Sequence, residues 1–217
     1  MSPLLEVKNL RIELTTRDGV APVIDDLSFT LNPGETMSFV GESGCGKSMT
    51  ALALMGLLPE KVGRVAAGNI IFDGEDLSQA SDERLRAIRG NEISMIFQEP
   101  MTSLNPVFTI GEQIAEVLRA HQGLSRNAAW AQSIELLNAV RIPNAKSRVS
   151  DYPFQMSGGQ RQRAMIAMAL ACQPKILIAD EPTTALDVTV QAQIFDLLTD
   201  LRKQTGAAII LITHDMG

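Results

Sequence analysis

A glycine-rich segment near the start of the chain has residue types and a spacing suited to binding phosphate. It reads Gly41-Glu42-Ser43-Gly44-Cys45-Gly46-Lys47-Ser48. Its glycines allow the backbone to curl so that successive N–H groups point at one anion. Lys47 can reach the terminal phosphates of a nucleotide, and Ser48 can bind Mg²⁺. The segment predicts a phosphate-binding loop, and a glycine-rich turn that happens to contain Lys-Ser is the alternative.

The residues on either side of this loop fit the phosphate-binding interpretation. The apolar run 37–40 has the length of a buried strand, and residues 49–58, beginning at Met49, have the length of a helix. A loop between a strand and a helix is the context that phosphate binding requires, because the helix start adds free N–H groups and its dipole. We interpret Cys45 as a spacing residue rather than a nucleophile, since the backbone does the binding there.

A pair of acids, Asp180 and Glu181, follows a continuous apolar run at 176–179. A carboxylate at the C-terminal end of a parallel strand lies where ligands bind in open α/β sheets. Asp180 fits a role in holding Mg²⁺ through water, and Glu181 could polarise a water that faces the γ-phosphate. The alternative is a pair of acids that only caps a strand or the next helix.

Two further polar residues also follow predicted strands. Gln98 ends the run 93–97 and can bind Mg²⁺ or the water, and His214 follows the strand expected at 207–213 and offers a donor to the γ-phosphate. Taken alone, Gln98 is more simply interpreted as a loop residue, and His214 as a surface histidine with its hydrogen bonds satisfied.

A second candidate anion site lies at residues 157–160, which read Ser157-Gly158-Gly159-Gln160. The serine can cap a helix that we expect to run to about residue 172, and the start of that helix favours an anion. One chain with two such sites could bind phosphates from two directions. An ordinary capped helix is the alternative.

The elements that must position these residues alternate between strands and helices. Strands are expected at 4–16, 23–31, 37–40, 69–72, 93–97, 175–180 and 207–213. Helices are expected at 81–88, 110–121, 125–140, 157–172 and 189–204. Turn signals occur at 17–19 and at 32–34, the second closing a hairpin-like pair, and Pro59 is expected to end the helix after the loop.

These elements predict an α/β fold with a mostly parallel sheet, an N-terminal antiparallel β subdomain and an inserted helical subdomain. No strand-like run occurs between residues 102 and 154. We therefore assign residues 1–98 and 157–217 to the α/β core and residues 99–156 to the helical insert, which leads into the helix at 157.

The bulk composition narrows the function classes. The chain has 217 residues, 45% of them hydrophobic, and a formal net charge of -6, which argues against a general nucleic-acid binder. Its two cysteines match no metal spacing and suggest a reduced compartment. No signal peptide is visible and no stretch approaches 18 uncharged apolar residues, so we expect any membrane role to come through a partner.

The full set of motifs resembles the ATP-binding cassette (ABC) ATPases in order and spacing. The set comprises residues 41–48, Gln98, Ser157-Gly158-Gly159-Gln160, residues 176–181, Ala185-Leu186-Asp187 and His214. The resemblance implies a P-loop NTPase core, ATP and Mg²⁺ as cofactors, and two cassettes stacked head to tail with each ATP between one phosphate loop and the other cassette's Ser157–Gln160 segment. It implies Ser48, Gln98 and Asp180 as metal residues, Glu181 as the catalytic base, Gln98 and His214 as contacts of the water or γ-phosphate, and Asp187 at the dimer seam.

A narrower resemblance is to the importers of oligopeptides, dipeptides, glutathione and nickel. It is carried by residues 97–106, Ile110-Gly111-Glu112-Gln113-Ile114 and residues 179–189. It implies an ATP-hydrolysing subunit at the cytoplasmic face of the bacterial inner membrane. In such a subunit the region after Gln98 would contact integral membrane permease subunits, and a periplasmic substrate-binding protein would be an indirect partner. The alternative is a soluble ABC ATPase in DNA repair or translation, which usually shows long insertions, zinc cysteines or tandem cassettes that are not visible in this sequence.

Three features depart from the family pattern. Met156 stands where many members have Leu, a swap of similar volume, and residues 14–19 lack the aromatic that many cassettes stack on adenine. The chain also ends at Gly217, three residues after His214, where family members usually continue. We expect lower stability than in a longer protein, and equal denaturant midpoints for the two would contradict this.

Overall fold

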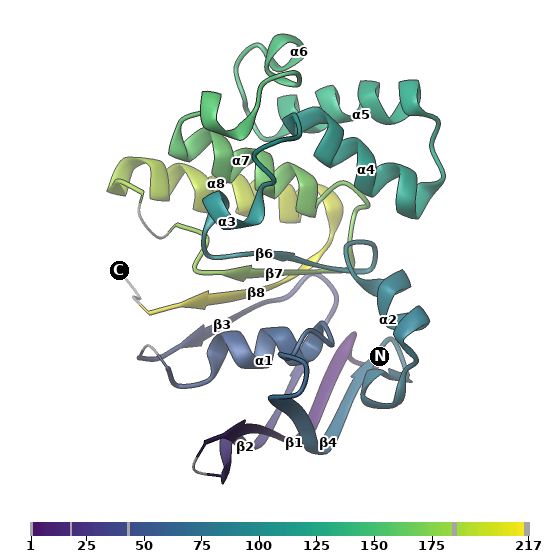
Figure 1. The fold of residues 1–217 in the computed structure, drawn as a ribbon, viewed down its shortest axis with the longest axis vertical. Helices are drawn as coiled ribbons and strands as arrows, with labels where there is room; N and C mark the ends of the chain where they lie inside the picture. The colour runs from purple at the N-terminus through teal and green to yellow at the C-terminus, as the bar shows by residue number, and fades with distance from the viewer. Residues whose placement is uncertain (1, 18, 43, 184–185, 215–217) are drawn as a thin grey trace.

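Two four-stranded sheets form the framework of the protein in the computed structural model, which describes residues 2–17, 19–42, 44–183 and 186–214 (Figure 1). The antiparallel sheet has the order β2-β1-β4-β5, with β1 at Leu5–Thr16, β2 at Gly19–Leu31, β4 at Gly63–Phe72 and β5 at Glu75–Asp76. The parallel sheet has the order β3-β8-β7-β6, with β3 at Thr36–Val40, β8 at Ala208–Thr213, β7 at Ile176–Asp180 and β6 at Ile93–Ile96. The predicted fold class is confirmed.

The register of the parallel sheet brings the ends of its strands to one edge. Val40 pairs with Thr213, and Asp180 pairs with Ile212. Every residue of β6 and β7 is buried, as expected for apolar runs covered on both faces. The segments that follow β3, β6, β7 and β8 therefore begin at the same edge.

Helices cover both faces of this sheet, and alternate residues of β7 contact them. Helix α1 (Lys47–Leu54) lies on one face, and α7 (Gly158–Ala169) and α8 (Val188–Thr205) lie on the other (Figure 1). Ile176 and Ile178 belong to the apolar cluster that includes residues of α1, whereas Leu177 and Ala179 belong to the cluster that includes residues of α7 and α8.

Several local predictions are wrong. The strands expected at 23–31 and 69–72 begin earlier, at Gly19 and Gly63. The turn at 32–34 does not close a hairpin, because it carries the chain from β2 in the antiparallel sheet to β3 in the parallel sheet. Helix α1 ends at Leu54 rather than near Pro59. Gly56, just after α1, adopts a left-handed backbone (φ +60°). Arg89, the C-cap residue of α2 (Asp82–Ile88), donates from Nε to the carbonyl of Met55 (2.6 Å) and so satisfies a carbonyl group at the C-terminal end of α1.

The block between β6 and α7 is helical, as predicted. It contains α3 (Pro100–Ser103), α4 (Ile110–Gln122), α5 (Arg126–Ala139) and α6 (Ala145–Arg148), and the described part of 102–154 has no strand. Ser81 and Ser125 cap α2 and α5 through their side chains, as expected. Short 3₁₀ turns lie at Leu77–Gln79 and Pro153–Gln155. The domain boundaries at 98/99 and 156/157 stay a prediction, since buried residues of α4 and α5 share one apolar cluster with α7 and β7.

Within the described residues, no helix has the length and apolarity needed to cross a membrane. Some residues named from the sequence lie outside the described part of the chain: Asp18 of the first turn, Ser43 of the phosphate loop, Ala185 and Gly217.

Gly111 controls how closely α4 approaches its neighbours. A Cβ atom built there would lie 2.7 Å from the Val149 carbonyl oxygen and 2.9 Å from Cζ3 of Trp130. We expect Gly111→Ala to lower the free energy of unfolding by about 1–3 kcal/mol through overpacking, although alanine is the better helix former. Urea unfolding measures the loss, and the exposed Glu116→Ala on the same helix should change stability by less than about 0.5 kcal/mol. Equal midpoints for Gly111→Ala and the parent would contradict the close packing.

Candidate nucleotide-binding site

The predicted phosphate loop connects β3 to α1, and its described glycines adopt the required backbone. Gly44 and Gly46 have φ angles of +85° and +92°, which are accessible to glycine without strain. A Cβ atom at Gly46 would also collide with the side chain of Ile24 from β2 and lie 3.2 Å from the Val23 carbonyl oxygen. Strand β2 therefore supports the loop from behind.

The first turn of α1 is suited to an anion. No side chain caps this helix and its first turn contains no acid. Neither a capping side chain nor a neighbouring carboxylate therefore competes with a bound anion for the N-terminal N–H groups. Thr50, which is buried, donates its hydroxyl to the Gly46 carbonyl (3.1 Å) and fixes the loop to the helix. Met49 packs against the apolar cluster beneath the antiparallel sheet.

Lys47 ties the loop together through its ammonium group. Its Nζ donates to the carbonyl oxygens of Gly41 (2.6 Å) and Glu42 (2.8 Å) and lies 3.6 Å from Sγ of Cys45. The ammonium thus already lies over the loop backbone. A bound phosphate would exchange these neutral acceptors for charged ones, which form stronger hydrogen bonds with an ammonium.

Ser48 and Asp180, which are 132 residues apart in sequence, meet at the edge of the sheet. The Ser48 hydroxyl donates to Oδ1 of Asp180 (3.1 Å). Asp180 is only 5% exposed, and this burial raises the pKa of its carboxyl, with the nearby charge of Glu181 adding to the effect and the Ser48 hydrogen bond opposing it.

This pair fits a magnesium ion that is held together with phosphates. Mg²⁺ typically binds one or two protein oxygens and completes its shell with water and substrate phosphates. The described residues contain no group of three or more His, Cys, Asp or Glu that could hold a metal by themselves. The Ser48 hydroxyl and the buried Asp180 carboxylate lie beside a phosphate loop, so they suit a Mg²⁺ ion held by two protein oxygens together with water and substrate phosphates.

Gln98, Glu181 and His214 come together from the ends of three strands. Gln98 donates from Nε2 to Oε2 of Glu181 (2.7 Å), and Nδ1 of His214 lies 3.5 Å from Oε1 of the same carboxylate. Glu181 has a φ angle of +44°, an uncommon conformation for a non-glycine residue, and its N–H donates to the Ile212 carbonyl (3.0 Å). Both oxygens of the carboxylate thus have neighbours that fix its direction.

The Ser157–Gln160 segment forms a capping box at the start of α7. The Ser157 hydroxyl accepts from the Gln160 N–H (3.3 Å), and Gln160 Oε1 accepts from the Ser157 N–H (3.0 Å). Among the described residues no hydrogen bond or ion pair joins this segment to the 41–48 loop, and α7 and α1 lie on opposite faces of the parallel sheet (Figure 1). The structure therefore brings the other predicted site residues together and leaves this segment apart.

Sequence reasoning missed the residues that support the two glycines of this segment. A Cβ atom at Gly158 would lie 3.6 Å from Leu186, and one at Gly159 would lie 3.1 Å from Cγ1 of Val190 in the first turn of α8. That turn is fixed by Asp187, which accepts a hydrogen bond from the Val190 N–H (3.0 Å). The sequence analysis named Asp187 only through the family resemblance, and nothing in the sequence pattern indicated that the start of α8 would contact the start of α7.

Comparisons with known proteins agree on one family. The model described as "ABC transporter" matches residues 24–184. The oligopeptide transport ATP-binding protein OppD of Haemophilus influenzae is 57% identical over 217 residues, covering 100% of this chain and 67% of that protein. OppD of Salmonella typhimurium is 54% identical, covering 99% of this chain and 63% of that protein. A putative peptide import ATP-binding protein of Brucella melitensis is 53% identical, covering 99% of this chain and 65% of that protein. The chain spans about two thirds of the length of these relatives.

Solved structures are similar over almost the entire chain. A dimeric post-hydrolysis state of the ATP-binding cassette MJ0796 bound to ADP and Pi has a TM-score of 0.86 at 28% identity, covering 98% of this chain and 88% of that one. The cbiO1 protein of Clostridium perfringens, part of the ABC transporter complex cbiONQ, has a TM-score of 0.79 at 26% identity (99% and 80%).

Burial of Asp180 predicts a conflict between stability and metal binding. Since burial raises the pKa of this carboxyl in the folded protein, its protonated form stabilises the fold at low pH, and this stabilisation is lost as pH rises through the raised pKa. We expect Asp180→Asn to raise the melting temperature of the nucleotide-free protein at neutral pH, by about 2–4 °C for each kcal/mol gained, and to weaken Mg²⁺ binding. Differential scanning calorimetry at pH 7 measures the first effect.

Ser48→Ala is the variant to compare with Asp180→Asn, because it keeps the buried Asp180 carboxylate and removes the hydroxyl that donates to it. We expect this variant to lower the melting temperature, because a buried charge then lacks a hydrogen-bond partner. A lower melting temperature for Asp180→Asn would contradict this account of the site.

Proposed function

Because this chain belongs to the ABC transporter family of ATP-binding proteins, we propose that it is the ATP-binding and ATP-hydrolysing subunit of a bacterial importer for peptides or a related small substrate. The observation that carries the proposal is the convergence of the 41–48 loop, the Ser48–Asp180 pair and the Gln98–Glu181–His214 group at one sheet edge. ATP and Mg²⁺ are the cofactors that this chemistry requires.

In this proposal the loop and α1 hold the phosphates. The backbone N–H groups of the loop and the uncapped start of α1 face the anion, and the Lys47 ammonium moves from its two carbonyl partners to the terminal phosphates. Ser48 and Asp180 would hold Mg²⁺, whose charge offsets that on the transferring phosphoryl group.

Glu181 acts as the general base. Its carboxylate takes a proton from the attacking water while the bond between the γ-phosphorus and the β,γ-bridging oxygen breaks, giving ADP and phosphate. Gln98 orients the carboxylate through its 2.7 Å hydrogen bond, and His214 lies on the other side of the same group. The φ angle of +44° at Glu181 fits a residue held in place for function.

The Ser157–Gln160 segment serves a second cassette. It is the start of a helix without an acid in its first turn, Ser157 is exposed, and it has no bond to the loop of its own chain in the described residues. It therefore suits a phosphate bound by another copy or by a paralogue, as in a head-to-tail dimer, with Asp187 near the seam. The dimeric MJ0796 cassette has the same fold.

The importer assignment rests on the relatives and on the helical block. Proteins with names that refer to oligopeptide transport or peptide import match at 52–57% identity over this chain. Phe108 and Phe154 of the block between β6 and α7 are 50% and 67% exposed, and Tyr152 stacks on Phe154 with ring centroids 5.5 Å apart. Exposed aromatics of this kind fit a contact with membrane permease subunits at the cytoplasmic face of the membrane; a periplasmic binding protein would deliver the substrate. A soluble ABC ATPase is not favoured by these names.

Removal of the proposed base tests the reaction. We expect Glu181→Gln to keep ATP binding and to lower the rate of ATP hydrolysis by about 10²-fold or more, because the amide cannot accept the proton from water. Phosphate release measures hydrolysis, and equilibrium dialysis with ATP and Mg²⁺ measures binding. The exposed Glu135→Gln on α5 is the matched control and should change neither. Hydrolysis at the parent rate in Glu181→Gln would refute the base assignment.

A further inference from the structure

The hairpin formed by β1 and β2 lies against the phosphate loop. A Cβ atom at Gly46 would meet the side chain of Ile24 and would lie 3.2 Å from the Val23 carbonyl oxygen, and both of these residues belong to β2. The free end of the hairpin and the loop between β3 and α1 lie on the same side of the molecule (Figure 1). A nucleotide whose phosphates bind the loop can therefore extend its sugar and base over the hairpin.

The pairing of β1 with β2 determines which side chains of the hairpin face the loop. Ile12 pairs with Ile24. Beyond a register shift at Val23, Leu14 pairs with Ala21. Residues two apart in a strand point to the same face, and paired residues share a face, so Leu14 and Ala21 lie on the face that carries Ile24. They lie about 7 Å further toward the free end of the hairpin.

This face continues into β4 as an apolar row of side chains. Leu14 also pairs with Gly63. A Cβ atom at Gly63 would lie 3.3 Å from Cδ2 of Leu14 and 3.3 Å from Cβ of Leu58. Ala21, Leu14 and Gly63 thus form a row across three strands, about 10 Å wide, without a side-chain nitrogen or oxygen. Ala21 is exposed and the other two are half-buried, so a ligand can cover this apolar row.

Among the described residues at the free end of the hairpin, the polar side chains are turned away, engaged elsewhere or held by no contact. Thr15 points to the opposite face of β1, and Thr16 donates its hydroxyl hydrogen to the Gly19 carbonyl (2.9 Å). Arg17 is exposed in the turn, and no hydrogen bond or ion pair of the described residues holds its side chain. A site discriminates strongly between bases only where fixed groups are left unpaired by the wrong base.

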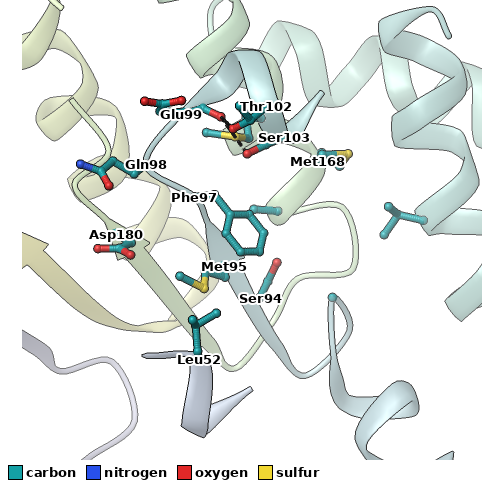
Figure 2. A pocket seen from close by; sticks show the side chains of 14 residues that line it. Leu52, Ser94, Met95, Phe97, Gln98, Glu99, Thr102, Ser103, Met168 and Asp180 are labelled. Carbon is teal, nitrogen blue, oxygen red and sulfur yellow. Dashed lines mark hydrogen bonds between the residues drawn. The ribbon is translucent and has the colours of Figure 1, made fainter. Parts of the chain in front are cut away.

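A cavity beside Gln98 is the other space near the site. It has a volume of about 670 Å³, and Leu52, Phe97 and Asp180 are among the residues that line it (Figure 2). None of the described residues of the 41–48 loop lines it, and it borders β6, the strand furthest from β3 in the parallel sheet. The hairpin is therefore better placed than this cavity to receive a base that extends from the loop.

We propose that the apolar row holds the nucleobase by contact alone, so that the chain binds nucleoside triphosphates as a class rather than ATP in particular. This inference rests on the proposed function, whose substrate class it defines. The phosphates supply most of the affinity through the N–H groups of the loop, Lys47 and Mg²⁺. The base adds burial of apolar surface on Leu14 and Ala21, which does not depend on the hydrogen-bonding groups at its edge.

Equilibrium dialysis of the whole chain with Mg²⁺ compares the binding of ATP, GTP and CTP. We expect the three dissociation constants to agree within about threefold, because no fixed group contacts the edge of the base. Failure of all three nucleotides to bind would refute the nucleotide site itself and the inference with it. Binding of ATP with GTP or CTP weaker by about tenfold or more would overturn the inference and leave the proposed function standing.

An aromatic side chain introduced into the apolar row locates the base. We expect Leu14→Phe to tighten ATP by about fivefold or more, because a base stacks better on an aromatic ring than on an aliphatic side chain. Thr15→Phe is the matched control, since it lies at the next position on the opposite face of β1, and it should leave all three affinities unchanged. Arg17→Ala should change the ratio of the ATP and GTP affinities by less than about twofold.

Ala21→Phe keeps the test open if Leu14→Phe disturbs the packing near Gly63, because Ala21 is exposed. We expect it to tighten ATP in the same direction. Circular dichroism checks that each variant is folded. Unchanged ATP affinity in both Leu14→Phe and Ala21→Phe, or an equal gain in Thr15→Phe, would place the base elsewhere and overturn the proposal.

Discussion

The register of the parallel sheet is the constraint on which the rest of the site depends. The sheet places the ends of β3, β6, β7 and β8 at one edge. At the end of each of these strands lies a residue to which we assign a role in binding phosphate or metal or in moving a proton. A shift of one residue in β7 would exchange its two faces and remove Asp180 from Ser48. The apolar strands that fill the core and the polar residues that follow them are therefore positioned by the same pairing.

The site carries features that oppose stability and that fit function. Asp180 is buried as a carboxylate whose pKa is raised, and Glu181 has a backbone conformation unusual for its residue type. Both lie at the end of the most buried strand, where surrounding packing can hold them. A local strain of this kind at the proposed catalytic edge, within an otherwise regular core, is what a phosphate-transfer site needs in order to fix its groups before the substrate binds.

Much of this arrangement could be predicted from sequence, because the signals are local. Alternation and capping indicated the helix starts at Ser81 and Ser125, and the unbroken apolar run before Asp180 indicated a buried parallel strand. The early end of α1 was not predicted, since it depends on Arg89, which is 34 residues away from Met55. The support of Gly159 by Val190 was missed for the same reason, because contacts between helices leave no periodic trace in either segment.

The most direct test of the account is whether one chain's loop is completed by another chain's Ser157–Gln160 segment. Lys47→Ala disables the loop, and Gly158→Asp places a carboxylate where phosphate would bind; its Cβ has ordinary room beside Leu186 at 3.6 Å. Each variant alone should hydrolyse ATP poorly. Mixing the two should restore hydrolysis, because a mixed dimer contains one site with both parts intact. An equimolar mixture with no more activity than the separate variants, or full activity in Gly158→Asp alone, would contradict a site shared between two copies of this chain.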